Sequence, residues 1–102
     1  MSAASPEELD TLLEDALLMN DGPAVAALFA GADVLVAAPG CIRHGAEATD
    51  LLAERGYLAS PCCVYVGHGI ALAVGERAVT VSWRGTDGRW RLLAVVVPAQ
   101  ST

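Results

Sequence analysis

The sequence is poor in basic and aromatic residues. Six arginines and lysines stand against twelve aspartates and glutamates, the formal net charge is -6, and aromatic residues make up 5% of the chain. A protein that binds nucleic acid needs a basic surface to neutralise phosphates. We therefore expect no nucleic-acid partner.

Long apolar runs and paired cysteines are also missing. No apolar run reaches the roughly 18 residues that span a bilayer, and the first ten residues, MSAASPEELD, lack the basic and then apolar regions of a secretory signal. Cys41, Cys62 and Cys63 are odd in number, and adjacent cysteines rarely pair, so we expect no disulfide framework. The expected setting is the reducing cytoplasm, without a membrane partner.

The sequence also lacks the common metal and nucleotide motifs. Cys62 and Cys63 are too close together for a zinc knuckle, and neither CxxC nor HxxxH occurs. Gly67 and Gly69 are not followed by a helical pattern, and no nucleophile elbow is present. We expect no metal and no cofactor.

Apolar residues, in contrast, are abundant. They make up 54% of a 102-residue chain in which only 18% of residues are charged. This composition predicts one folded domain over residues 1–102, with residues 1–4 and 99–102 as flexible tails. A small domain buries a limited share of its surface, so we expect an oligomer, a lined cavity, or both.

The first helix has a clear start and a clear apolar stripe. Ser5, Pro6 and Glu8 form the pattern of a capping box with proline at the first helical position. The apolar residues then recur at three- and four-residue steps, and the acidic residues are expected on the solvated side. The stripe comprises Leu9, Leu12, Leu13, Ala16 and Leu17, and the acids are Glu7, Glu8, Asp10, Glu14 and Asp15.

Two further helices and a first strand pair follow. Asp21 and Pro23 can open a short helix with Val25, Leu28 and Phe29 on one face, and Gly31 is placed to end it. Residues 33–38 and 41–44 are strand-like and flank a Pro-Gly turn, and residues 45–55 fit a third helix.

From residue 62 onward the apolar residues recur at every second position instead of at helical spacing, and this alternation is typical of strands. Residues 62–74, 78–84 and 89–97 are expected to form three strands joined by two hairpins. Gly75-Glu76 and Asp87-Gly88 fit two-residue turns, and a bulge or bend is expected at residues 67–69. Helices followed by an antiparallel meander predict an α+β fold.

The order and spacing of these segments resemble the SnoaL-like proteins of the nuclear transport factor 2-like superfamily. The resemblance rests on residues 25–30 leading into residues 33–36 and a Pro-Gly turn, on residues 45–48, and on residues 78–84 followed by 87–91. It covers nearly the whole chain. It implies a cone-shaped curved antiparallel sheet wrapped around the N-terminal helix, with two further short helices, an internal pocket and homodimers through the sheet.

The resemblance does not select one function, because the superfamily includes isomerases, cyclases, dehydratases and non-catalytic binding domains. The helix region 9–19 lacks the tyrosine of the steroid isomerases, and the last three expected strands hold no acid outside their turns. These departures favour a homodimer that binds a small apolar molecule. An acid–base enzyme acting on a polyketide- or steroid-like substrate and a protein-interaction module are the alternatives.

Three titratable residues are candidates for catalysis, each with a plainer alternative. His68, between two glycines, could be a base on the concave side of the sheet or a histidine without a functional role at a bulge or strand edge. Asp33 could be a buried base or the first residue of a strand. His44, after Arg43, could bind an anion at a pocket mouth or be solvated. The expected pocket-lining residues are Leu13, Leu17, Phe29, Tyr57, Tyr65 and Trp83, although ordinary core or dimer contacts would also explain the aromatic ones.

Overall fold

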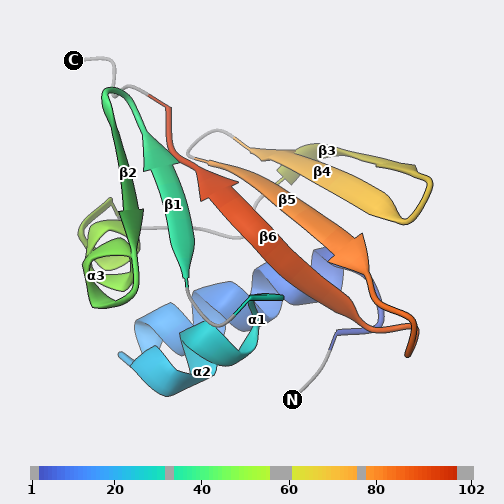
Figure 1. Cartoon of the computed structure of the whole chain (residues 1–102), viewed down its shortest axis with the longest axis horizontal. Coiled ribbons are helices and arrows are strands. Elements are labelled where there is room, and N and C mark those ends of the chain that lie inside the picture. Colours follow the sequence, from blue (N-terminus) through green and yellow to red (C-terminus); the bar gives the residue numbers. More distant parts are fainter. Residues whose placement is uncertain (1–2, 32–33, 56–60, 76–77, 99–102) are drawn as a thin grey trace.

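A computed structural model describes residues 3–31, 34–55, 61–75 and 78–98 of the chain. Asp33 and Tyr57, and the Glu76 of the expected Gly75-Glu76 turn, lie outside these residues. Within the described residues, three helices and six strands follow one another (Figure 1). Their order is α1 (Pro6–Leu18), α2 (Gly22–Ala27), β1 (Leu35–Ala38), β2 (Cys41–His44), α3 (Ala46–Arg55), β3 (Pro61–Gly67), β4 (Ile70–Gly75), β5 (Val79–Arg84) and β6 (Trp90–Val96). The α+β prediction with three helices is confirmed.

Helix α1 begins where the sequence predicts. The Ser5 hydroxyl accepts a hydrogen bond from the Glu8 amide (3.1 Å), which satisfies one of the free donors at the helix start. Leu9, Leu13 and Ala16 are buried as expected. The expectation for the acids is wrong at one position, because Asp10 is also buried, one helical turn after Pro6 on the same face.

Helix α2 is shorter than predicted. Asp21 caps it by accepting from the Ala24 amide (3.2 Å), but the helix ends at Ala27 with Leu28 as its C-cap, so Gly31 does not end it. Phe29 has already left the helix and forms a bridge with Leu92 on β6. The physical reason is that backbone bonds to β6 replace the last helical turn: the Leu28 carbonyl accepts from the Leu92 amide.

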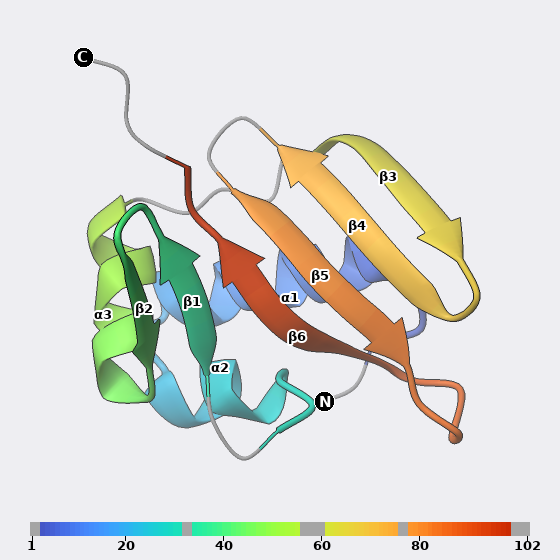
Figure 2. The same cartoon turned by 45° about the horizontal axis from the view of Figure 1, so that its top comes forward.

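The six strands form one open sheet in the order β2-β1-β6-β5-β4-β3. All neighbouring strands are antiparallel except β1 and β6, which run parallel, so the curved sheet is mixed. Figure 2 shows β6 between β1 and β5, with α1 behind the sheet and no helix in front of β3–β6. One face of the sheet is therefore covered by helices and the other is open.

The segment from residue 62 to residue 74 is a hairpin instead of one bulged strand, so that prediction is wrong. His68 and Gly69 have positive φ angles of 53° and 75°, and Gly67 pairs with Ile70. Two successive positive φ angles are the signature of a two-residue turn whose twist matches that of the flanking strands. Histidine is one of the few residues besides glycine, asparagine and aspartate that tolerate this conformation.

The hairpin between β5 and β6 is confirmed, but its turn is longer than predicted. The Gly88 amide donates to the Gly85 carbonyl, and the Gly85 amide donates to the Arg89 carbonyl, which leaves three residues in the loop. Gly88, at φ 79°, supplies the left-handed position. Farther along, the register shifts so that Leu93 is an extra residue on β6, and such a bulge bends a sheet.

The core lies between α1, α2, α3 and the covered face of the sheet. Its largest fully buried side chains are Leu9, Leu13, Leu52, Leu92, Val25, Val34, Val36 and Val95. Ala3, within the segment expected to be a tail, is buried and bridges to Trp90. None of the described helices is both long and apolar enough to cross a bilayer.

Candidate functional site

The polar centre of the interior is a hydrogen bond between α1 and β5. The Thr80 hydroxyl donates to Oδ1 of Asp10 over 3.0 Å, and both residues are buried, with Asp10 only 4% exposed. A carboxylate removed from water is costly unless hydrogen bonds or charges satisfy it. The Asp10–Thr80 bond therefore ties the buried face of α1 to β5.

Apolar residues surround this bond. On the sheet, Thr80 lies between Ala73 of β4 and Val95 of β6. Ser82 is on the same face of β5 as Thr80, two residues farther on, and is also buried. Among the residues that the structure describes, Asp10, Thr80 and Ser82 are the buried polar ones. A carboxylate and two hydroxyls among apolar groups can orient a mostly apolar ligand or move a proton.

Sequence reasoning missed Asp10 because it grouped all acids of α1 on the solvated side. The signal was present in the spacing, since Asp10 is four residues after Pro6 and three before Leu13. Residues at these spacings share one helix face. An acid within an apolar stripe is a stronger functional candidate than an acid beside one.

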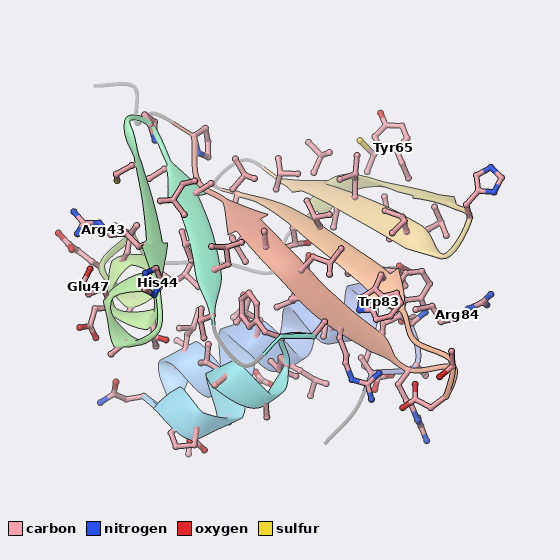
Figure 3. All side chains as sticks on the ribbon, in the orientation of Figure 1. Arg43, His44, Glu47, Tyr65, Trp83 and Arg84 are labelled. Carbon is pink, nitrogen blue, oxygen red and sulfur yellow. The ribbon has the colours of Figure 1, made fainter. Side chains whose placement is uncertain are left out.

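The described members of the predicted pocket-lining set do not gather around one space. Leu13 and Phe29 are buried in the core, and Leu17 is partly buried against it. Tyr65 and Trp83 are 61% and 38% exposed. Figure 3 shows Tyr65 on the side of the sheet that faces away from the helices. The described members of the set are thus divided between the core and the open sheet.

The open face of β3–β6 is a continuous apolar surface. Tyr65 lies opposite Leu72, Leu72 opposite Val81, and Val81 opposite Ala94, which forms one row across four strands. A second row includes Ile70 and Trp83. The exposed large apolar side chains of the six strands, on either face, are Leu35, Ile42, Tyr65, Val66, Ile70, Leu72, Trp83, Leu93 and Val96. The segments that form the strands contain no aspartate or glutamate.

The two described histidine candidates are both exposed and lie on different parts of the sheet. His68 is in the β3–β4 turn, not within a strand as expected, and His44 is at the end of edge strand β2, opposite Leu35. Neither residue lies beside Asp10 in the core. The structure thus brings together none of the described catalytic candidates, and it adds Asp10 to them.

Two exposed side-chain pairs shift the acidity of their members. The hydrogen bond between the Cys63 thiol and the Tyr65 hydroxyl (3.4 Å) raises the pKa of the tyrosine. Arg43 on β2 pairs with Glu47 on α3 at 3.3 Å (Figure 3), and hydrogen bonds to Cys41 and Glu47 raise the pKa of the guanidinium. Both pairs are exposed, so they are surface features.

Open clefts occur on the helical side and at the hairpin end. A cleft of about 290 Å³ between α1 and α2 is lined mainly by apolar side chains, including Leu12, Met19 and Leu28. Another, of about 400 Å³, lies between α2 and α3. Within the described ranges, no three His, Cys, Asp or Glu side chains gather to hold a metal ion.

No protein-family model and no curated protein matches this chain. Solved structures do resemble it. A candidate ketosteroid isomerase from Shewanella frigidimarina NCIMB 400 has a TM-score of 0.58 at 17% sequence identity. The superposition covers 86% of this chain and 89% of the isomerase chain. A second, from Parabacteroides distasonis ATCC 8503, has a TM-score of 0.58 at 19% identity and covers 94% of this chain and 88% of its own.

These similarities show the fold. The helix-backed, curved and open sheet is the nuclear transport factor 2-like fold that the resemblance of the sequence to SnoaL-like proteins predicts. At this level of identity a shared fold does not carry over an activity.

Proposed function

We propose that this chain acts as a homodimer, joined through the open face of the sheet, that binds a small apolar molecule inside the cone. The observation that carries the proposal is the apolar row from Tyr65 through Leu72 to Val81 on a face that no helix covers. Monomeric proteins rarely leave a continuous apolar surface of this kind in water.

The composition of the face supports a second copy of the chain as its partner. In a two-fold dimer each surface meets itself, so a charged surface would place like charges together. Most of this face is aliphatic and aromatic, and the strands place no carboxylate on it. Its charged residue is Arg91, opposite Trp83 near the β5–β6 loop, and Arg91 is paired with Asp87. A stable interface of standard size takes about 800 Å² from each partner. That is roughly an eighth of the 5953 Å² accessible surface of this chain.

Light scattering coupled to size-exclusion chromatography tests the dimer. Leu72→Glu would place a carboxylate at the centre of the face, and we expect it to convert dimer to monomer. Leu18→Glu is the matched control, because Leu18 is exposed on α1, outside the sheet. A wild-type chain that elutes as a monomer at micromolar concentration would refute the dimer. A complex of this chain with a different protein, instead of the homodimer, would favour an interaction module.

The ligand part of the proposal is supported by the fold and by the interior chemistry. The two solved neighbours are named for isomerases of ketosteroids, which are compact apolar molecules with few polar groups. In this chain Asp10, Thr80 and Ser82 offer polar atoms among apolar walls that include Leu13. Of the other proposed lining residues, Phe29 is buried in the core and Leu17 is partly buried against it. Tyr57, outside the described residues, stays a proposed member of the set.

Binding of a ketosteroid such as 5-androstene-3,17-dione is the direct test of the ligand. We expect saturable changes in the amide resonances of α1 and β5, and a weaker affinity in Leu13→Phe, which fills the same space. Resonance changes confined to the α1–α2 cleft would place an apolar ligand outside the cone and contradict the proposed site.

A second candidate function is acid–base catalysis, and the buried Asp10 favours it. Asp10 would take a proton from a carbon next to a carbonyl and return it to another carbon, with Thr80 holding the carboxylate in place. Asp33 and His68 remain alternative bases. Isomerisation of the same steroid, followed by the ultraviolet absorbance of the conjugated product, should be lost in one of Asp10→Asn, Asp33→Asn or His68→Asn. Unchanged turnover in all three, or none in the wild type, would end this candidate.

A further inference from the structure

An open cleft of about 790 Å³ lies at the end of the sheet where two hairpin turns meet. Its walls come from the β3–β4 turn, from the end of β5 and from the β5–β6 loop, and Ala4 of the N-terminal segment closes one side. The residues that line it are Ala4, His68, Gly69, Arg84, Gly85, Thr86, Gly88 and Trp90. None of them belongs to the open sheet surface or to the Asp10–Thr80 bond.

The charge of this cleft is opposite to that of the chain. The sequence has twelve acidic residues and only six basic ones, yet the cleft is lined by a guanidinium and an imidazole and by no carboxylate. The side chains of Arg84 and His68 make no hydrogen bond or ion pair with another residue that the structure describes. Figure 3 shows Arg84 directed outward from the end of β5.

The acidic residue closest in sequence to this lining is already neutralised. Asp87 forms a bidentate ion pair with Arg91, at 2.7 and 3.1 Å, and that guanidinium holds the pKa of the Asp87 carboxyl well below its usual range. The pair lies against Gly85, where an added Cβ would be 2.7 Å from Nη1 of Arg91. Arg84 therefore keeps its charge available to the cleft.

Backbone hydrogen bonds hold the β5 end that carries Arg84 and the turn that carries His68 in a fixed relation. The Arg84 amide donates to the Gly69 carbonyl over 2.8 Å, which ties the β5 end to the residue next to His68. Trp90, only 7% exposed, forms part of the wall, and its amide donates to the Ala3 carbonyl over 3.0 Å. The cleft is thus built on sheet hydrogen bonds, and little ordering is needed when a ligand binds.

We propose that this cleft binds the oxyanion group, a carboxylate or a phosphate, of a small ligand through Arg84 and His68. A guanidinium presents two parallel N–H donors that match the two oxygens of such a group. His68 adds a donor from the neighbouring turn. The proposal is independent of the dimer and of an apolar ligand in the cone.

Amide-resolved NMR titration of the full chain tests the site with inorganic phosphate and succinate in separate arms, and sodium chloride at matched ionic strength as the control. We expect saturable shifts at Gly69, Gly85 and Thr86 with at least one of the two oxyanions. Saturation by phosphate alone or succinate alone identifies the class of group. Shifts that grow linearly and equally with chloride would overturn the proposal.

Variants separate a site from general charge attraction. Arg84→Gln should weaken the oxyanion affinity at least fivefold, and His68→Asn should weaken it severalfold while keeping a residue that tolerates the positive φ of the turn. Arg43→Gln removes an arginine from β2 and should leave the affinity unchanged. An equal loss in Arg84→Gln and Arg43→Gln, with amide spectra that show both variants folded, would refute the assignment.

Discussion

Replacing Thr80 by valine tests whether the interior hydrogen bond holds α1 against the sheet. The change keeps the shape of the side chain and removes the hydroxyl that donates to Oδ1 of Asp10. A buried hydrogen bond to a charged group contributes about 1.5–3 kcal/mol. For a domain of about 100 residues each kilocalorie corresponds to roughly 4–8 °C, so the melting temperature should fall by roughly 6–24 °C.

Urea unfolding followed by tryptophan fluorescence at one fixed protein concentration measures this loss. Thr11→Val is the matched control, because the Thr11 hydroxyl also donates, to the Glu7 carbonyl, but is exposed on α1. We expect the control to stay within about 0.5 kcal/mol of the wild type. The variant Asp10→Ala completes a double-mutant cycle with Thr80→Val, and the two losses should not add. A Thr80→Val loss below about 0.5 kcal/mol, or fully additive losses, would refute the reasoning.

Three further outcomes are expected. Leu13→Ala should lower the free energy of unfolding by about 2–5 kcal/mol in urea titrations, whereas Leu18→Ala, at a position that is 73% exposed, should change it little; similar losses would contradict the assigned core. His68→Val should destabilise the β3–β4 hairpin by about 1–2 kcal/mol in thermal melts while His68→Asn stays near the wild type, because a β-branched residue resists positive φ. The Asp87–Arg91 pair should support the β5–β6 loop fully above pH of about 4 and lose this effect as the pH falls farther, since the pKa of Asp87 is lowered in the folded chain. Carboxyl NMR titration with Asp87→Asn as the reference checks this, and an ordinary midpoint for Asp87 would contradict it.

Apolar periodicity predicts most of the helices and strands because each has one face against the core and one face toward solvent. The stripe of α1, with Leu9 and Leu13, and the alternation in β5, with Thr80 inside and Val81 outside, are repeated faithfully in the burial of these residues. The Ser5 cap is likewise local in origin. Patterns that depend on neighbouring residues could therefore be predicted from the sequence.

Turns and helix ends are less predictable because partners distant in sequence decide them. His68-Gly69 lacks the asparagine or aspartate of a common hairpin turn, yet the pairing of β3 with β4 selects a two-residue turn there. In the same way the contact of Leu28 with Leu92, 64 residues later, shortens α2. The parallel pairing of β1 with β6 has no local signal at all.

The candidate site was the least predictable part. Asp10 becomes notable only when Thr80 is placed beside it, 70 residues away in sequence. Tyr65 and Trp83 have the composition of pocket walls, but whether a strand residue faces the helices or the open side follows from a register that composition does not reveal. Likewise, His68 and Arg84 come together through the bond between the Gly69 carbonyl and the Arg84 amide.

The central place of β6 has a consequence for how the chain reaches its native state. The β1–β2 pair and the β3–β5 meander do not touch each other in the sheet, and only the last strand joins them. During synthesis β1 and β5 each have an unpaired edge until residues 90–96 leave the ribosome. Pairings between strands so far apart in sequence are slow to form. A chain stopped before Trp90 would lack the strand that joins β1 to β5, and its unpaired strand edges would be exposed to aggregation.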